Sequence, residues 1–228
     1  MTLGDRIVAM KDGVIHQADT PLVTYNHPRN RFVAGFIGMP PMNFFDGAIK
    51  VIDGRMVFEE GTTKSRLGKP PHPKPCPPST GGEGTREDAG IFNGELTLPG
   101  IGFRLTVPVW LREALSGRVG QHVVLGIRPE HLHRMPVGDD ENCCPLQMKL
   151  NVIEPLGNDM DVYMQTNLTD HVVARVEASA EAAAAFGGAA QTTVYADRRK
   201  IHFFEPGESG LNLSLATGHS KELPHALA

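Results

Sequence analysis

The sequence predicts a mainly β fold, either a small barrel or a sandwich. Apolar residues alternate with polar or small ones over 103–107 and 148–152, and a period of two is typical of half-buried strands. Asp53-Gly54 lies between two further short runs, and Asp-Gly favours a tight hairpin turn. Among the 228 residues are 25 glycines and 18 prolines, well above the roughly 12% that is usual for the pair. This composition excludes a coiled coil, a helical bundle and a fully disordered chain.

The N-terminal segment combines a hairpin with two helices. Strands are predicted at 5–10 and 14–17, because the Asp-Gly pair between them supplies the positive φ of a tight turn. Thr20 followed by Pro21 is typical of a helix N-cap and first helical position. A second helix is predicted over 29–37, where apolar residues recur on one face. These residues are Phe32, Val33, Phe36 and Ile37.

Beyond Asn43 the spacing of apolar residues changes from helical to strand-like. Around eight to ten short strands with little helix indicate a small β-barrel or sandwich. Helices are expected only at 108–115 and in the alanine-rich segment 179–186. The predicted strands are 48–52, 55–58, 103–107, 123–127, 148–152, 161–165, 172–176, 193–196 and 201–204.

Residues 61–89 fit neither pattern. They show no apolar periodicity, and positions 70–78 hold six prolines. Such a segment cannot bury enough apolar surface to offset its ordering entropy. We therefore expect a flexible, Pro-rich insertion that is partly in the polyproline II conformation. A ligand for a proline-recognition domain is the functional alternative.

Charge and cysteine content narrow the possible partners and the compartment. A net charge of −4 and an isoelectric point near 6.2 give no electrostatic reason to expect nucleic acid or an anionic membrane. Aromatic residues make up only 6%, which argues against single-strand nucleic-acid binding by a small barrel. No stretch approaches the roughly 18 apolar residues that cross a bilayer. Cys76 and the adjacent Cys143 and Cys144 cannot form a disulfide framework, so we expect free thiols in a reducing cytoplasm.

No motif for catalysis, cofactor binding or metal binding is present. The sequence contains no G-x-x-x-x-G-K-[ST] phosphate loop, no G-x-S-x-G elbow and no H-E-x-x-H. His131 and His133 are expected to be solvated near a strand end, since no spacing marks further zinc ligands. We expect Trp110 and Phe36 to pack in the core. From its residues alone the chain is a binding or regulatory module with no catalytic residue predicted.

Four stretches resemble one family of transport proteins. The first is LGDRIVAMKDGVIHQADTPLVTYN at 3–26, which continues into HPRNRFVAGFIGMPPMNF at 27–44. The others are LGIRPEHL at 125–132, VIEPLGNDMDVYM at 152–164 and IHFFEPGESGLNL at 201–213. The combination is similar to the ATP-binding (ATPase) subunits of bacterial ABC importers for sugars and glycerol phosphate, of the maltose-importer type. It covers nearly the whole chain apart from the insertion.

The resemblance implies a division into domains. Residues 1–38 resemble the C-terminal remnant of an ABC nucleotide-binding domain, a short α/β piece. Residues 39–218 resemble the regulatory domain that follows it, an oligonucleotide/oligosaccharide-binding (OB)-fold-type barrel of the TOBE type that dimerises. The flexible insertion at about 61–89 belongs to this second domain. Residues 219–228 form a tail.

In similar subunits the residues that bind and hydrolyse ATP precede the L-x-D-R-I-V strand. The resemblance therefore implies no ATP-binding residue in this chain, and ATP and Mg²⁺ are expected only for the full-length subunit. Either the chain is a fragment of such a subunit or further family sequence lies upstream of Met1. The whole subunit would couple ATP hydrolysis to solute uptake, whereas this chain is expected not to be an enzyme by itself.

The resemblance also implies partners and a location. The chain would be the regulatory and dimerising portion of the subunit, cytoplasmic and peripheral to the inner membrane. Its partners would be a second copy, the membrane permease subunits through the full-length protein, and a regulatory protein or small molecule. A stand-alone barrel that binds an oxyanion or a sugar is the alternative, although no Ser/Lys/Gly-rich anion pocket can be identified in the sequence.

We place the candidate interface or regulatory surface on two polar, turn-rich loops beside strands. For Gly157 the structural alternative is a positive φ in a turn. For Arg128 it is an intramolecular ion pair with Glu130 or another carboxylate, worth about 1 kcal/mol at most if exposed. Asp159 stands where many relatives carry a glutamate, which is one methylene longer. The candidate residues are Arg128, Glu130, His131, Gly157, Asn158 and Asp159.

The first two predicted strands carry apolar residues on both faces. In the family they would join a larger sheet, so part of their cover is absent from this chain and an edge is left unpaired. We expect residues 1 to about 20 to be either mobile or paired with another copy of the chain. The residues that lack cover are Ile7, Val8, Val14 and Ile15.

Overall fold

A computed structural model describes residues 4–61, 101–138, 142–179, 186 and 191–216. Most of the Pro-rich insertion, the predicted helix at 179–186 apart from its two end residues, Cys76 and the tail at 219–228 lie outside the described residues. The predictions for these segments therefore stay predictions.

The described residues form short strands with few helices. The strands are β1 (Ile7–Lys11), β2 (Val14–Asp19), β3 (Asn43–Ile52), β4 (Arg55–Gly61), β5 (Ile101–Thr106), β6 (His122–Ile127), β7 (Leu132–His133), β8 (Cys143–Leu156), β9 (Asp159–Gln165), β10 (Val172–Glu177), β11 (Gln191–Asp197) and β12 (His202–Phe204). The helices are α1 (Pro21–Asn26), α2 (Arg31–Phe36) and α3 (Val109–Leu115), with 3-10 turns η1 (Ser116–Arg118), η2 (Pro129–His131) and η3 (Leu213–Ala216).

Local sequence signals explain the N-terminal lobe, which we define as residues 4–38. The turn between β1 and β2 has positive φ at Asp12 (50°) and Gly13 (78°), as a two-residue hairpin turn requires. Thr20 caps α1 by accepting a hydrogen bond from the Val23 N–H at 3.4 Å, with Pro21 at the first helical position. The predicted hairpin and the predicted start of the first helix are confirmed.

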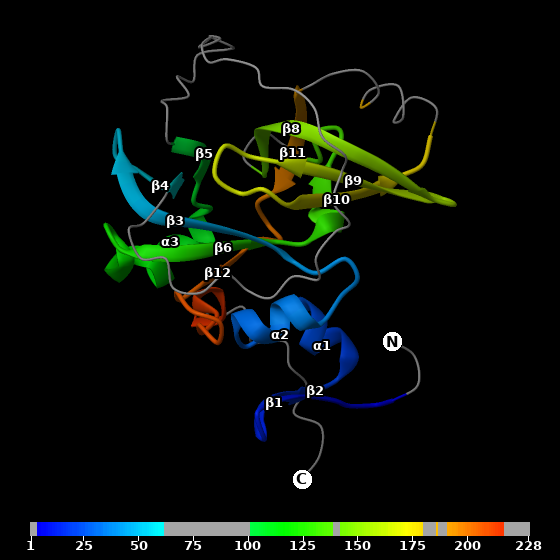
Figure 1. Cartoon of the computed structure of the whole chain (residues 1–228). Coiled ribbons are helices and arrows are strands. Elements are labelled where there is room, and N and C mark those ends of the chain that lie inside the picture. Colours follow the sequence, from blue (N-terminus) through cyan, green and yellow to red (C-terminus); the bar gives the residue numbers. More distant parts are fainter. Residues whose placement is uncertain (1–3, 62–100, 139–141, 180–185, 187–190, 217–228) are drawn as a thin grey trace, which may run out of the picture.

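Two five-stranded antiparallel sheets form the rest of the fold, which we call the β-domain. Their strand orders are β12-β6-β3-β4-β5 and β10-β9-β8-β11-β7, and Figure 1 shows them one above the other. A single cluster of buried residues, including Phe45, Leu125 and Val162, fills the space between them. The mainly β, barrel-like fold predicted from the sequence is confirmed. Several strands are longer than predicted. Strand β3 begins at Asn43, five residues before the predicted start. Strand β8 runs for 14 residues and includes two prolines, although proline argues against a strand in sequence.

Two buried polar groups tie the sheets together. Asn43 at the start of β3 accepts a hydrogen bond from the Val173 N–H and donates one to the Val173 carbonyl, both at 2.8 Å. Glu60 in β4 accepts hydrogen bonds from the hydroxyls of Thr166 at 2.8 Å and Thr169 at 2.6 Å, and from the Phe103 N–H. Buried polar atoms that find such partners fix one arrangement of the sheets, because leaving them unpaired is costly.

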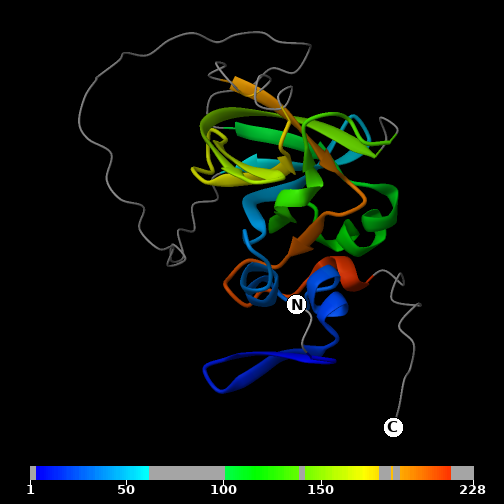
Figure 2. The same cartoon turned by 90° about the vertical axis from the view of Figure 1, so that its right-hand side faces the viewer.

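The N-terminal lobe packs against one end of the β-domain. In Figures 1 and 2, α1 and α2 lie between the β1–β2 hairpin and the lower sheet. Ala34 of α2 contacts a small cluster that contains Val124 and Phe204 of that sheet. The chain after β12 also contacts the lobe: the Asn212 side chain donates a hydrogen bond to the Pro28 carbonyl, just before α2, at 2.8 Å. Helix α2 is therefore held from two sides.

The lobe has little core of its own, and much of its apolar surface is exposed. Its buried cluster consists of Ala9, Val33 and Ile37, with Ile7 packed beside them. The expectation that Phe36 is a core residue is wrong, because its side chain is 65% exposed; the lobe covers only one edge of the apolar face of α2. On the hairpin, the residues between 52% and 60% exposed are Val8, Met10, Val14 and Ile15.

Candidate functional site

Arg128, the first predicted site residue, lies at the boundary between the lobe and the β-domain. It directly follows β6 and is only 1% exposed. Its guanidinium donates to the Ile37 carbonyl at 2.8 Å and to the Tyr25 carbonyl, and it stacks on the Tyr25 ring at 3.6 Å. A planar cation suits this position, since it can bond two carbonyls and face an aromatic ring at once. Arg128 therefore holds the ends of α1 and α2, and its side chain is almost fully shielded from solvent.

Tyr25 links Arg128 to the second predicted residue, Glu130. The Tyr25 hydroxyl lies 2.7 and 2.6 Å from the two carboxylate oxygens of Glu130. Burial, together with the hydrogen bond to that carboxylate, raises the pKa of Tyr25 to about 12. The phenol thus stays protonated and donates. Arg128 and Glu130 are coupled through Tyr25 and not by the direct ion pair that the sequence allowed.

Gly38 leaves room for this arrangement. Its φ is +124°, and a Cβ there would lie 3.0 Å from Nη1 of Arg128 and 3.3 Å from the Tyr25 ring. A side chain at this position would therefore be strained and would also push against the guanidinium.

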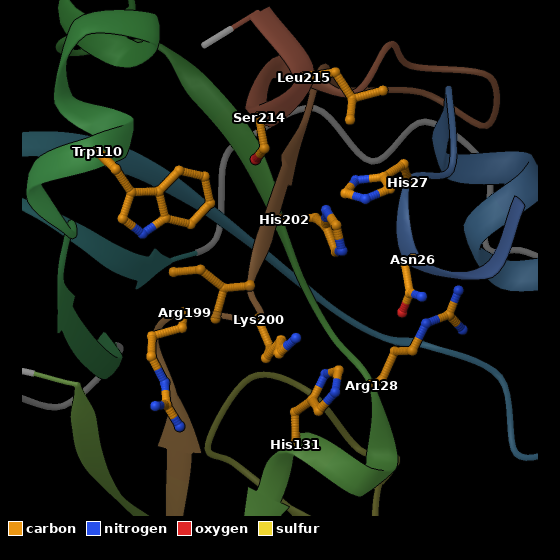
Figure 3. A pocket seen from close by; sticks show the side chains of 11 residues that line it. Asn26, His27, Trp110, Arg128, His131, Arg199, Lys200, His202, Ser214 and Leu215 are labelled. Carbon is orange, nitrogen blue, oxygen red and sulfur yellow. The ribbon is translucent and has the colours of Figure 1, made fainter. Parts of the chain in front are cut away.

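A pocket of about 390 Å³ opens beside Arg128. Figure 3 shows His27 at the end of α1, His131 in η2 and His202 in β12 around it, with Trp110 of α3 across from them. The expectation that His131 is solvated is wrong: its side chain is 19% exposed, and burial lowers its pKa. Trp110 packs partly against the core, as expected, but it also lines this pocket.

The other predicted loop, 157–159, lies at the tip of the β8–β9 hairpin. All three residues are exposed, and Gly157 has φ +81° with no atom near its missing Cβ. The turn geometry fully explains this glycine. Two apolar side chains of β8 near the tip, Val152 and Leu156, are also about half exposed, so the tip presents both polar and apolar groups.

The strand that carries Arg175, β10, borders both loops: it pairs with β9 as far as Asp159 and packs against η2. Arg175 in β10 makes a bidentate ion pair with Asp161 at 2.8 and 2.7 Å and donates to the Met39 carbonyl at 2.8 Å. The hydrogen bonds to Asp161 raise the pKa of Arg175, and the charges of Asp159 and Glu130 act in the same direction. The structure therefore brings the exposed carboxylates of both predicted loops to the side of the β-domain that carries Arg175.

Sequence reasoning missed several residues of this region. Tyr25 lies 103 residues from Arg128, and neither Arg175 nor His202 belongs to a motif with a known spacing. The one available signal was that Tyr25, Arg128 and His202 all lie in the four stretches that carry the family resemblance. Proximity in space was not readable from those stretches.

The described residues offer no metal centre and no membrane span. Among them, no three His, Cys, Asp or Glu side chains are grouped closely enough to hold a metal ion. Within the described ranges, Cys143 and Cys144 are not joined by a disulfide. No helix in the described ranges has both the length and the apolar character needed to span a membrane.

Comparison with known proteins gives a consistent relationship. The profile of the TOBE domain matches residues 125–204. The oligosaccharides import ATP-binding protein MsmX of Bacillus subtilis is 32% identical over 90% of this chain and 44% of its own length. The maltose/maltodextrin import ATP-binding protein MalK of Vibrio cholerae is 32% identical over 75% of this chain and 34% of its own length. The chain thus spans less than half the length of the curated relatives it matches.

A solved structure is also similar, at much lower identity. The cytoplasmic molybdate-binding protein ModG, with molybdate bound, is 14% identical and superimposes with a TM-score of 0.37 over 72% of this chain and 96% of its own. This likeness is too distant to support an inference about fold or ligand.

Proposed function

Because this chain is a relative of the ATP-binding subunits of ABC importers and carries a TOBE domain, we propose that it is the regulatory and dimerising portion of such a subunit. The observation that carries the proposal is that one relationship covers 90% of the chain, and thus the lobe and the β-domain together. The buried Arg128 contacts at their boundary support the same reading, because they hold the lobe against the β-domain.

The proposed role is mechanical. If the β-domain pairs with its copy in a second subunit, the lobe beneath it is held at a fixed distance from the pair axis. A regulator that binds one arrangement of the two subunits better than another then shifts their equilibrium by its differential affinity. The ATP and Mg²⁺ of the reaction are proposed to belong to the whole subunit, since this sequence contains no phosphate loop.

The proposed partners follow from this role. They are a second copy of the subunit, the membrane permease subunits of the importer and a regulatory protein or small molecule. The location that fits these partners is the cytoplasmic face of the inner membrane. The names of the relatives point to sugars as the class of solute.

We place the pairing surface on the β8–β9 tip and the adjoining carboxylates. The tip is exposed, and it combines charged with half-exposed apolar side chains, a mixture that suits an interface with an apolar centre and a polar rim. Glu130 lies on the same side, next to the lobe. A second copy that binds this surface would therefore contact the β-domain close to its boundary with the lobe.

Sedimentation equilibrium of the chain tests the proposal. We expect a monomer–dimer equilibrium, weakened roughly tenfold or more by Asp159→Arg, because a reversed charge at the rim opposes close approach. Glu113→Arg is the matched control: it makes the same charge change on α3, at the opposite end of the β-domain (Figure 1). A chain that stays monomeric up to about 100 µM would contradict the dimerising role. Equal effects of the two substitutions would contradict the placement.

A further inference from the structure

The pocket beside Arg128 is built from both parts of the molecule. Asn26 and His27 come from the lobe, whereas His131, His202 and Trp110 come from the β-domain. Figure 3 shows His27, His131 and His202 around one space, with Trp110 on the far side from His27, whereas the guanidinium of Arg128 lies at the edge of this space toward Asn26. The pocket is therefore complete only when the lobe is docked.

The lining is strongly basic. Arg128 and Lys200 belong to it, together with Arg199 and three histidines, and none of the described lining residues carries a carboxylate. Arg199 is neutralised by its ion pair with Asp197 at 2.8 Å. Arg128 gives its two hydrogen bonds to carbonyls, and Lys200 forms no ion pair with any described carboxylate. Arg128 and Lys200 thus bring positive charge to the pocket without an ion pair, whereas Arg199 is paired with Asp197 and His131 lies 4.0 Å from Glu130.

Two buried nitrogens of the lining, Nε of Arg128 and Nδ1 of His131, lack a hydrogen-bond partner among the described residues, and the first of them is a hydrogen-bond donor. Nδ1 of His202 lies 3.3 Å from the Asn212 amide nitrogen, which can only donate, so the proton of this imidazole is on Nε2. Unpaired buried donors cost free energy, and a ligand that accepts hydrogen bonds would recover it.

Burial and the neighbouring positive charges change the pKa of His202 in the pocket. Burial, reinforced by the charges of Arg128, His27, His131 and Lys200, lowers the pKa of His202 to about 3. A neutral His202 donates from Nε2 without adding charge. An anion in the pocket would offset the neighbouring cations and raise that pKa again.

The volume of the pocket and its apolar side limit the chemical class of ligand further. A volume of about 390 Å³ lies in the range of metabolite pockets, roughly 300–1,000 Å³, and far exceeds the roughly 30 Å³ of a single water. Trp110, Ile201 and Leu215 give the pocket an apolar side against which a flat or ring-shaped body can pack. No group of described residues could hold a metal ion there.

We propose that this pocket binds a phosphate ester of a small ring-bearing metabolite, with the phosphate on the side of Arg128, Lys200 and His202 and the ring against Trp110. Phosphate oxygens accept several charge-assisted hydrogen bonds at once, and arginine and lysine are the side chains that bind them best. Because the lining spans the boundary, the bound ester fastens the lobe to the β-domain. This proposal stands apart from the proposed transport role and holds or fails without it.

Trp110 is the single tryptophan of the chain, so its fluorescence reports on the pocket directly. The titration uses glucose 6-phosphate against glucose, AMP against adenosine, and inorganic phosphate. We expect at least one ester to change the Trp110 emission saturably, and to bind roughly tenfold or more tighter than its neutral counterpart and than inorganic phosphate. No saturable change with either ester up to about 10 mM would overturn the proposal. So would a neutral compound or inorganic phosphate that binds as tightly as the esters.

Variants locate the site. Lys200→Gln changes an exposed side chain, so the fold is expected to survive, and it should weaken ester binding roughly tenfold. Lys149→Gln, on the exposed face of β8, is the matched control and should leave binding unchanged. Amide exchange with saturating ester should slow selectively in α1. Equal losses in the two lysine variants, or no slowing in α1, would show that the ester binds elsewhere.

Discussion

The β-domain and the N-terminal lobe differ in how much of their apolar surface they bury. The β-domain encloses one continuous apolar cluster between two sheets, and its polar groups Asn43 and Glu60 are satisfied internally. The lobe buries only three apolar residues in a cluster of its own, exposes the outer face of its hairpin and depends on Arg128 and Asn212 for anchorage. The β-domain therefore satisfies its own core, whereas the lobe leaves apolar side chains uncovered.

The largest effect should come from the β-domain core. Phe58 is fully buried in the main cluster, so Phe58→Ala should lower the free energy of unfolding by about 3–5 kcal/mol through lost burial and a cavity. Urea unfolding followed by circular dichroism measures it. Val51→Ala, at an exposed position on β3, is the control and should change the value by less than about 0.5 kcal/mol. A decrease in the free energy of unfolding of less than about 1 kcal/mol for Phe58→Ala would contradict a tightly packed core around Phe58.

The second-largest effect should come from the Arg128 contacts at the boundary between the lobe and the β-domain. Arg128→Ala removes hydrogen bonds to the buried Ile37 carbonyl and the partly buried Tyr25 carbonyl, so docking of the lobe should weaken by about 2–4 kcal/mol. Amide exchange in α1 and α2 should then accelerate while β9 and β10 keep their protection. Arg128→Lys should recover only part of the loss, since an ammonium cannot bond both carbonyls and stack on Tyr25.

The exposed Arg55→Ala in the β3–β4 hairpin serves as the control for loss of an arginine. It should leave exchange in both parts unchanged. Equal acceleration in β9 and in α1 on Arg128→Ala would mean that lobe and β-domain unfold as one unit, and it would contradict a lobe that undocks separately.

The features that the sequence could predict are those made by residues close together in the chain. The Asp12-Gly13 turn and the Thr20 cap were predicted, because the residues that make them are neighbours in the chain. Arg128 was picked out from a polar loop, but its burial was not, since its partners Tyr25 and Ile37 lie 103 and 91 residues away. Phe36 was misplaced, because an apolar helix face does not tell how much of it a small lobe can cover.

A smaller effect is expected at Gly38. Gly38→Ala places a Cβ 3.0 Å from Nη1 of Arg128 at a φ of +124°, so it should cost about 1–3 kcal/mol of lobe docking. Thermal unfolding and exchange in α2 measure it. Gly117→Ala, which meets no atom within 4 Å and needs no positive φ, should be neutral or slightly stabilising. If both variants behave alike, the close approach of Gly38 to Arg128 has no energetic role.

The smallest effect concerns pH. Burial raises the pKa of Glu60 above its usual value of 4.5, although the Thr169 and Thr166 hydroxyls partly oppose the rise. The folded state then holds this proton more tightly than the unfolded chain does. Stability from this group is therefore present below pH 4.5 and is lost as the pH rises through the folded-state value. Urea unfolding between about pH 4.5 and pH 7 should show this slope.

Glu60→Gln should flatten that pH dependence, because the amide cannot titrate. The exposed Glu113→Gln on α3 is the matched control and should keep it. An unchanged slope in Glu60→Gln would mean that the carboxylate gains as much from its hydrogen bonds as it loses by burial.

The most direct test of the unequal halves is amide exchange of the chain at a concentration where sedimentation shows only monomer. The amides of β1 and β2 should exchange roughly a hundredfold or more faster than those of β6 and β9, because the hairpin lacks cover on its outer face. Protection of β1 and β2 equal to that of β6 in a verified monomer would contradict this expectation.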